Sequence, residues 1–450
     1  MADPTITAMI VALSALSLIV LLTALRETVA ESGWDSAALL GAFSVMLFST
    51  AYLAVTYSGA WVSVTRQNQD IWLLPRWGRY TIMLVGIALI TVSAVILFRA
   101  VRRRSKVYNV AAVLLLAAGI VSCVSTVLNG DDPFRPEVAV LLAVVAACTV
   151  APRGLGVHVG IGTCCVMVAI VSGFAIAVHK DFSVMQCVSD KCGILGFNFR
   201  GSFHHENAFA MFLTLALPFV YIGFATWKGP VLSAYVLALI LITGSRSATA
   251  TAVLTFVVLM LVRPNIRRAA WAPWRTCFVY LVLAVAFIVG LALPYMTNDP
   301  SFLTSRGHLW ILARDQLSDP AALLYGKGMW GWQHVRDAGL IHISSGYSLH
   351  NQWLDVLYAT GLIGLVLLVG ALALVVRQAG RTYSLVAGCV LLPLLLLSVT
   401  ERPFSIDTAD WVMWVVPGVL LSYPVGERIS ARQTRQTNAP EQDPRADTAS

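Results

Sequence analysis

One histidine stands where a long polar segment meets an apolar run, in Tyr347-Ser348-Leu349-His350-Asn351. A histidine at such a mouth can act as a general base near neutral pH, although an interfacial histidine bonded only to water would give the same pattern. Asp355 follows Asn351 by about one helical turn, and it could orient polar neighbours or simply face a wet cavity. We take His350 as the candidate catalytic base, with Asn351 and Asp355 in support.

Arginines in short polar motifs could bind an anion. A guanidinium group suits phosphate because it stays charged and donates hydrogen bonds in a bidentate fork. Each could instead be an interfacial arginine that extends toward lipid headgroups, and we expect Arg402 to pair with its neighbour Glu401. The motifs are Arg200-Gly201-Ser202-Phe203-His204-His205-Glu206-Asn207, Gly244-Ser245-Arg246-Ser247, Ser305-Arg306-Gly307-His308 and Glu401-Arg402.

Arg246 is the sharpest of these candidates. The apolar run of 14 residues before it, 230–243, spans only about 21 Å as a helix, against a hydrocarbon core of roughly 30 Å. The break at Gly244-Ser245-Arg246 should therefore sit below the surface, where non-helical backbone is tolerated only beside protein or a water-filled cavity. An arginine there is costly and favours a cavity-lining, anion-binding role.

Two further sets of polar residues accompany these arginines. Ser305 can cap a short helix of about 306–318, ended by Asp319-Pro320, which would place Arg306 and His308 in its first turn. His204, His205 and Asn207 occupy a second mouth, where they could be a loop turn or a polar lining. A pair of histidines alone is not a metal site.

The amino-acid composition indicates that lipid rather than water surrounds most of the chain. The chain has 450 residues, of which 58% are hydrophobic and 12% charged, and its mean hydropathy is +0.76. Soluble domains carry about 25% charged residues, so a soluble globular protein is excluded and lipid must be the main solvent. The net charge of +8 then reports membrane orientation rather than nucleic acid binding.

Apolar windows predict thirteen membrane spans, with an uncertainty of one. Basic clusters at residues 99–106 and 263–275 should be cytoplasmic. Alternation then places residues 179–205 and the long segment 296–350 outside and the polar, disordered tail 429–450 inside. Cys187 and Cys192 could form a disulfide if their loop faces an oxidising compartment. The windows are 5–25, 36–57, 80–98, 107–128, 137–151, 156–178, 206–226, 230–243, 247–262, 275–295, 351–376, 382–399 and 409–425.

A family resemblance enters through the spacing around His350. His350-Asn351, nine residues and then Gly361-Leu362-Ile363-Gly364 fit the pattern H-N-x9-G-x-x-G. The sequence thereby resembles the O-antigen ligase and O-antigen polymerase superfamily, membrane enzymes that move glycans off polyprenyl diphosphate. The order of the parts is similar too: Phe203 to Asn207, Gly244-Ser245-Arg246, Ser305 to Trp310, Tyr325-Gly326-Lys327-Gly328 and then His350.

The resemblance implies an all-α integral membrane glycosyltransferase, GT-C-like, with about 12–13 transmembrane helices and a large structured external loop, 296–350. It divides the chain into N-terminal helices 1–195, a ligase-like core 196–366, C-terminal helices 367–428 and the tail 429–450. Arg246 and Arg306 match the two diphosphate-binding arginines of the family, and His350 matches its histidine. We add Arg200 to the diphosphate site, and His308 and Asn207 to the supporting residues.

The implied reaction transfers a glycan from a polyprenyl-diphosphate-linked donor to a glycan or glycolipid acceptor at the external face of the cell membrane. A diphosphate leaves readily, so charge stabilisation and a base suffice and no cofactor or metal is expected. Direct displacement would invert the anomeric centre. A ligase, a polymerase and a transferase to protein remain open. The alternative from another class is a transporter for an anionic solute, against which the aromatic external segment stands.

Overall fold

The computed structural model describes residues 3–32, 34–66, 69–103, 108–187, 192–224, 226–268, 272–341 and 348–423. Some residues of the sequence predictions lie outside these ranges. They are the polar tail 429–450, Tyr347 of the motif that contains the candidate histidine, and Arg104 and Lys106 of the first basic cluster.

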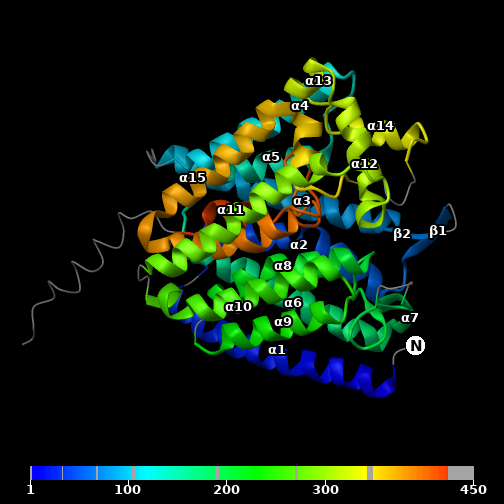
Figure 1. The fold of residues 1–450 in the computed structure, drawn as a ribbon. Coiled ribbons are helices and arrows are strands. Elements are labelled where there is room, and N and C mark those ends of the chain that lie inside the picture. Colours follow the sequence, from blue (N-terminus) through cyan, green and yellow to red (C-terminus); the bar gives the residue numbers. More distant parts are fainter. Residues whose placement is uncertain are drawn as a thin grey trace, which may run out of the picture.

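Apolar helices make up most of the described chain (Figure 1), as expected where lipid leaves every backbone polar group to be satisfied within the chain. Short antiparallel hairpins join β1 (Val62–Arg66) to β2 (Gln69–Leu73) and β3 (Val184–Met185) to β4 (Asn198–Phe199). The helices that coincide with predicted spans are α1 (Pro4–Ser32), α2 (Ser36–Tyr57), α3 (Arg76–Arg102), α4 (Val110–Leu128), α5 (Pro136–Cys148), α6 (Gly156–Val178), α8 (Glu206–Gly223), α9 (Lys228–Leu241), α10 (Arg246–Arg268), α11 (Pro273–Met296), α15 (Gln352–Leu397) and α16 (Val415–Leu421).

Nine helices in the described part of the chain are long and apolar enough to cross a membrane. The prediction of an all-α integral membrane protein is therefore confirmed. Three of the thirteen windows correspond to shorter helices, α5, α9 and α16. A helix of 13 residues such as α5 covers only about 20 Å, so loop backbone completes these three segments.

Helix α15 contains two of the predicted spans, because the chain reverses direction at Gly380, where φ is +58°. Trp353 lies against Gly290 near the end of α11. Further along, Tyr280 near the start of α11 donates a hydrogen bond to the carbonyl of Ser384. Val399 then lies again beside Gly290. The two halves of α15 thus form an antiparallel hairpin.

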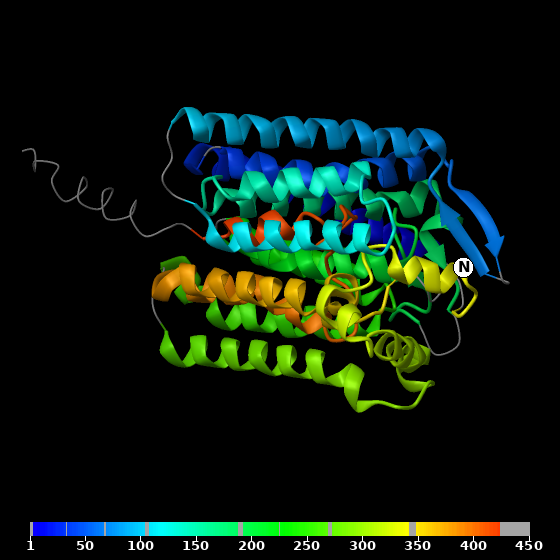
Figure 2. The ribbon, with the colours of Figure 1, turned by 90° about the horizontal axis from the view of Figure 1, so that it is seen from above.

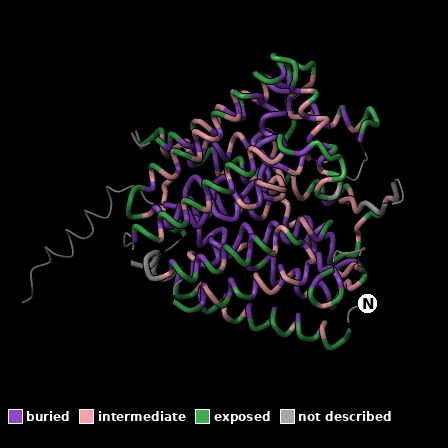
Figure 3. Tube along the Cα trace, viewed as in Figure 1, coloured by how far each residue is buried: buried purple, intermediate pink, exposed green. Residues whose placement is uncertain are grey.

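The core of the bundle lies around α8, whose residues are nearly all buried, with α6 packed against α8 and α2 packed against α6. Helices α1, α3 and α11 lie at the periphery, and their outward faces are exposed and apolar (Figure 3). Figure 2 shows the long helices running roughly side by side. Exposed apolar faces on peripheral helices are the surface that a bilayer covers.

The segment between α11 and α15 folds into three short helices at one end of the bundle, at the right of Figure 1. They are α12 (Phe302–Gln316), α13 (Pro320–Tyr325) and α14 (Gly331–Asp337). Their apolar side chains form a second small core with the first turns of α15, and it includes Trp310, Trp332 and Tyr358. The prediction of a large structured loop is confirmed. We call this end of the molecule the His350 end.

The short helix predicted over 306–318 begins earlier, at Phe302. The proposal that Ser305 caps it is wrong, because Ser301 holds the N-cap position and Ser305 lies inside the helix with a φ of +70°. The expected stop at Asp319-Pro320 is confirmed. Asp319 accepts backbone hydrogen bonds from Ala321 and Ala322, and so caps α13.

Candidate active site

The backbone of His350 is held in an uncommon conformation by its neighbours. Its φ is +51°, in the left-handed region that few residues other than glycine adopt. The amide of Leu349 donates to the Asp355 carboxylate at 3.3 Å, and the indole of Trp310 donates to the carbonyl of Leu349 at 2.8 Å. The His350 amide donates to the hydroxyl of Ser348 at 3.3 Å. Strained backbone that is fixed from several sides is common at active sites.

Asn351 joins three elements immediately after the histidine. Its side-chain oxygen accepts the Leu354 amide at 2.9 Å and so caps α15. Its side-chain nitrogen donates to the carbonyls of Gly290, at 2.8 Å, and Val399, at 3.0 Å. The residue is fully buried. Asn351 therefore fixes where His350 stands relative to the ends of α11 and α15, and its amide is fully used within the protein.

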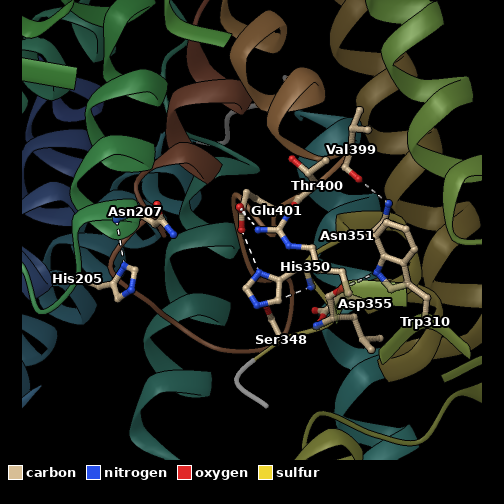
Figure 4. A network of polar contacts seen from close by, with 12 residues as sticks. His205, Asn207, Trp310, Ser348, His350, Asn351, Asp355, Val399, Thr400 and Glu401 are labelled. Carbon is tan, nitrogen blue, oxygen red and sulfur yellow. Dashed lines mark hydrogen bonds and ion pairs between the residues drawn. The ribbon is translucent and has the colours of Figure 1, made fainter. Parts of the chain in front are cut away.

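The imidazole of His350 lies against the carboxylate of Glu401, just beyond the second half of α15 (Figure 4). Nδ1 of His350 is 3.1 Å from Oε2 of Glu401. The other carboxylate oxygen accepts a hydrogen bond from Nη2 of Arg306 at 2.6 Å, and Nη1 of Arg306 donates to the carbonyl of Thr400. Among the described residues, Nε2 of His350 has no hydrogen-bond partner. The group thus places a carboxylate between a cation and an imidazole.

The Glu401 carboxylate is stabilised in its ionised form. Burial opposes ionisation, but the hydrogen bonds and charges of His350 and Arg306 outweigh burial and hold the pKa of Glu401 below its ordinary value. An ionised carboxylate on Nδ1 selects the tautomer with its proton on that nitrogen. Nε2 then carries the lone pair that a general base needs.

Arg402 does not pair with Glu401, so that sequence prediction is wrong. Nη1 of Arg402 lies 3.3 Å from the Asp355 carboxylate instead. Successive residues of an extended loop point in different directions, so Glu401 faces His350 while Arg402 turns to α15. The pair leaves the other oxygen of Asp355 to hold the Leu349 amide. Asp355 thereby contacts both the Leu349 amide and the Arg402 guanidinium group.

The spacing from His350-Asn351 to the glycines reflects a break in α15. Gly361 has a φ of +66°, and the interruption frees the carbonyls of Tyr358 and Ala359 from helical hydrogen bonding. They accept the amides of Lys327, at 2.7 Å, and Gly328, at 3.0 Å. A Cβ on Gly361 would lie 2.2 Å from the Leu324 carbonyl oxygen. The motif therefore docks the glycine-rich turn of the loop onto the helix that carries the histidine.

The described hydrogen bonds bring together His350, Arg306, Asn351 and Asp355 of the predicted site. The other predicted residues lie outside this bonded group. Asn207 is the second residue of α8, and its amide donates to Nδ1 of the N-cap residue His205 at 3.1 Å (Figure 4). The His308 side chain is exposed on α12.

Arg246 is the first residue of α10, and its side chain is exposed. The break before it is lined by protein, as predicted for non-helical backbone at that depth. The carbonyl of Ile242 accepts the Phe199 amide at 3.0 Å, and Thr243 and Ser245 are buried. The start of a helix carries partial positive charge, which adds to that of the guanidinium group.

Arg200 has a different environment from the one expected of a phosphate ligand. The residue is only 2% exposed. Its Nε donates to the carbonyl of Phe182, and its guanidinium lies 3.9 Å from the centre of the Phe182 ring and 4.9 Å from that of Trp72. Burial, with some support for the charge from Glu206, lowers the pKa of Arg200 to about 10. Arg200 ties the loop before α8 to the β1–β2 hairpin.

Two residues of the site were not selected from the sequence. Glu401 was assigned to Arg402, its neighbour in the chain, and only the fold shows that it faces His350. Trp310 could have been found, because it follows Arg306 by four residues and one face of a helix would carry both. With that spacing, α12 contacts Glu401 through Arg306 and the carbonyl of Leu349, next to His350, through Trp310.

A comparison with known families gives a match over part of the chain. Residues 231–369 match the family model described as O-Antigen ligase. This part of the chain is therefore similar to an O-antigen ligase domain. The match includes Arg246, Arg306 and His350 and ends before Glu401, and it supports assignment to the O-antigen ligase-like superfamily of membrane glycan ligases and polymerases. The chain matched no curated protein and no solved structure.

Proposed function

We propose that this protein is a membrane glycosyltransferase that moves a glycan from a polyprenyl-diphosphate donor to a hydroxyl group of a glycan or glycolipid acceptor. The proposal rests on the contact between His350 and Glu401. His350 lies within the region that matches the O-antigen ligase model, and Glu401 lies beyond the end of that region. In a general base of this type, a carboxylate contacts one nitrogen of the histidine and orients the ring. The second nitrogen points away from the carboxylate and can accept a proton.

In the proposed reaction, Nε2 of His350 takes the proton of the acceptor hydroxyl. The acceptor oxygen forms a bond to the anomeric carbon of the donor sugar, and the bond between that carbon and the diphosphate oxygen breaks. The diphosphate leaves on its lipid. Glu401 stabilises the imidazolium ion while it exists, and a single displacement of this kind inverts the anomeric centre.

Arginines would stabilise the charge on the departing diphosphate. A guanidinium group has five N–H donors, and Arg306 uses two of them on Glu401 and Thr400. The others can reach phosphate oxygens without breaking the contact with Glu401. Arg246 adds a second exposed cation at a helix start, where anions are favoured. Arg200 is not part of this proposed phosphate site, because it is buried and its guanidinium group lies against Phe182 and Trp72.

We place this site on the external side of the cell membrane. Basic clusters favour the cytoplasm for the opposite end of the bundle. Cys187 and Cys192 form a disulfide in the loop between β3 and β4, and this loop packs against the break before α10 at the His350 end. Disulfides persist in oxidising compartments, which supports the same orientation.

The test compares wild type, His350→Ala and Arg306→Ala in a host that lacks this protein, at matched membrane levels. Lipid-diphosphate-linked glycan and finished surface polysaccharide are quantified. We expect both variants to accumulate the linked donor and to lose the polymer. His179→Ala is the matched control, because His179 lies at the same end of the bundle in contact with Tyr57 and outside the ligase domain.

Wild-type levels of donor and polymer in both variants would contradict the proposal. Movement of an anionic solute in vesicles, with no glycan product, would favour a transporter in its place. The length of the product separates a ligase, which transfers a finished chain, from a polymerase, which extends one.

A further inference from the structure

A surface groove of about 340 Å³ lies at the His350 end, apart from the hydrogen-bonded group around His350. One wall is the turn between α4 and α5, and the other is the start of α14. The lining includes Phe134, Arg135, Trp330, Gln333 and two aspartates. Its volume falls within the roughly 300–1,000 Å³ of small-molecule sites.

The two walls of the groove are joined by direct contacts. The indole nitrogen of Trp330 donates to the carbonyl of Asp132 at 3.1 Å, and Nε2 of His334 lies 2.7 Å from Oδ2 of Asp131. The Arg135 guanidinium lies 3.7 Å from the centre of the Trp330 ring. The groove is therefore formed before a ligand arrives, which lowers the entropic cost of binding.

Phe134 is the unusual member of this lining. Its side chain is 88% exposed, and the turn holds it outward because Asp132 accepts the Phe134 amide at 2.8 Å. Single exposed apolar residues are common on surfaces. This ring, however, lines a groove together with a half-buried tryptophan, so a flat apolar ligand face would meet two aromatic side chains.

The charge of the groove selects among ligands of the proposed reaction. Asp131 and Asp132 supply two carboxylates, and Arg135 supplies one guanidinium; His334 also lines the groove and contacts Asp131. Because there is a carboxylate for each basic side chain, the groove has no excess of positive charge to attract a diphosphate. Carboxylates accept hydrogen bonds, an amide such as that of Gln333 both donates and accepts, and a guanidinium donates. Aromatic rings with this mixed set fit a sugar, which has apolar C–H faces and a rim of hydroxyl groups.

Backbone hydrogen bonds also connect one wall of the groove to α15, the helix that follows His350. Trp330 follows the turn whose residues Lys327 and Gly328 bond to Tyr358 and Ala359 of α15. Ala359 lies eight residues beyond Asn351, about 12 Å along the helix. The start of α14 and His350 are therefore both attached to the first turns of α15.

We propose that the groove between the α4–α5 turn and α14 is a saccharide-binding site that holds sugar rings of the glycan substrate at a distance from the reacting bond. This inference rests on the proposed glycan transfer. Sugar rings could come from the donor glycan or from the acceptor glycan, and both have the chemistry that the groove recognises.

The test measures binding to the purified full-length protein in nanodiscs by saturation-transfer NMR and calorimetry. One probe is oligosaccharide released by mild acid from the host's lipid-diphosphate-linked glycan, and the other is oligosaccharide cut from finished surface polysaccharide. We expect Phe134→Ala to weaken binding of one probe about three- to tenfold, the loss of one stacking ring. Tyr80→Ala, which removes another exposed aromatic ring, should leave binding unchanged within about twofold.

The probe that responds identifies the source of the sugar. Asp132→Asn should weaken the same probe, because a carboxylate acceptor is lost, and should leave inorganic pyrophosphate unbound. Equal oligosaccharide binding by wild type and Phe134→Ala would overturn the inference. Pyrophosphate binding that tightens in Asp132→Asn would overturn it in favour of an anion site.

The failure of the inference and that of the proposed function are distinguishable. If His350→Ala abolishes transfer while Phe134→Ala binds both probes like wild type, only the saccharide groove is refuted. If His350→Ala transfers glycan normally, the proposed role of His350 is refuted whatever the groove binds.

Discussion

Glu401→Gln tests the role assigned to the carboxylate behind His350. The change keeps the size of the side chain and removes the charge that contacts Nδ1 of His350 at 3.1 Å and Nη2 of Arg306 at 2.6 Å. A glutamine amide can donate to Nδ1, which favours the tautomer with the proton on Nε2. That tautomer cannot accept a proton from the acceptor hydroxyl.

The expected loss follows from the value of a general base. Such a base contributes about 10²- to 10⁴-fold to a rate, or about 3–5 kcal/mol of activation free energy. We expect kcat to fall by that factor and KM for the lipid-linked donor to change little, because Arg306 stays in place through Thr400. Removing one partner of a buried ion pair should also lower the free energy of unfolding by about 3 kcal/mol.

The assay follows donor consumption in membranes with matched protein levels and records thermal melting of the purified variant. Glu401→Asp keeps the charge and should recover part of kcat. Glu137→Gln is the control, since Glu137 is an exposed glutamate at the start of α5. A Glu401→Gln protein with wild-type kcat would refute the claim that this carboxylate orients the histidine.

Three further outcomes are expected. Trp310→Phe removes the donor to the Leu349 carbonyl and should cost about 1 kcal/mol of stability, with kcat reduced about tenfold as the backbone of His350 loosens; an unchanged kcat would contradict this. Gly361→Ala should destabilise by more than about 2 kcal/mol, because its Cβ would overlap the Leu324 carbonyl at a positive φ, whereas Gly370→Ala should melt near wild type. Burial, together with the charges of His205 and Arg200, lowers the pKa of His204 to about 3. The unfolded chain therefore binds a proton at His204 more readily than the folded chain, and stability should fall as the pH drops from about 6.5 toward 3. His204→Gln should make the melting temperature less dependent on pH in this range.

Hydropathy was sufficient to locate the helices, because each apolar window of the sequence lies on a helical segment. It could not give their lengths at α5, α9 and α16, where loop backbone completes the segment. At the opposite end of the bundle from His350, for example, the side chain of Asn109 donates to the carbonyl of Leu420. Such hydrogen bonds depend on tertiary contacts and leave no apolar period in the sequence.

The site was only partly predictable for a similar reason. His350, Arg306 and Asp355 were selected because polar residues stand out at the edge of apolar runs, and the structure joins them in one hydrogen-bonded group. The partners of Glu401 and Arg402 depend on which way two adjacent side chains of a loop point, and adjacency in the sequence favoured the wrong pair. The environment of Arg200 was not predictable either, since this arginine of a polar motif lies buried against Phe182.

The most direct test of glycan transfer uses the purified protein in liposomes with lipid-diphosphate-linked glycan from its host and the host's acceptor fraction. We expect wild type to release lipid diphosphate and to form a glycan product whose new linkage has the opposite anomeric configuration to the donor. His350→Ala should form neither. Retained configuration would contradict the single displacement, and donor consumption by His350→Ala at the wild-type rate would contradict the central role of the histidine.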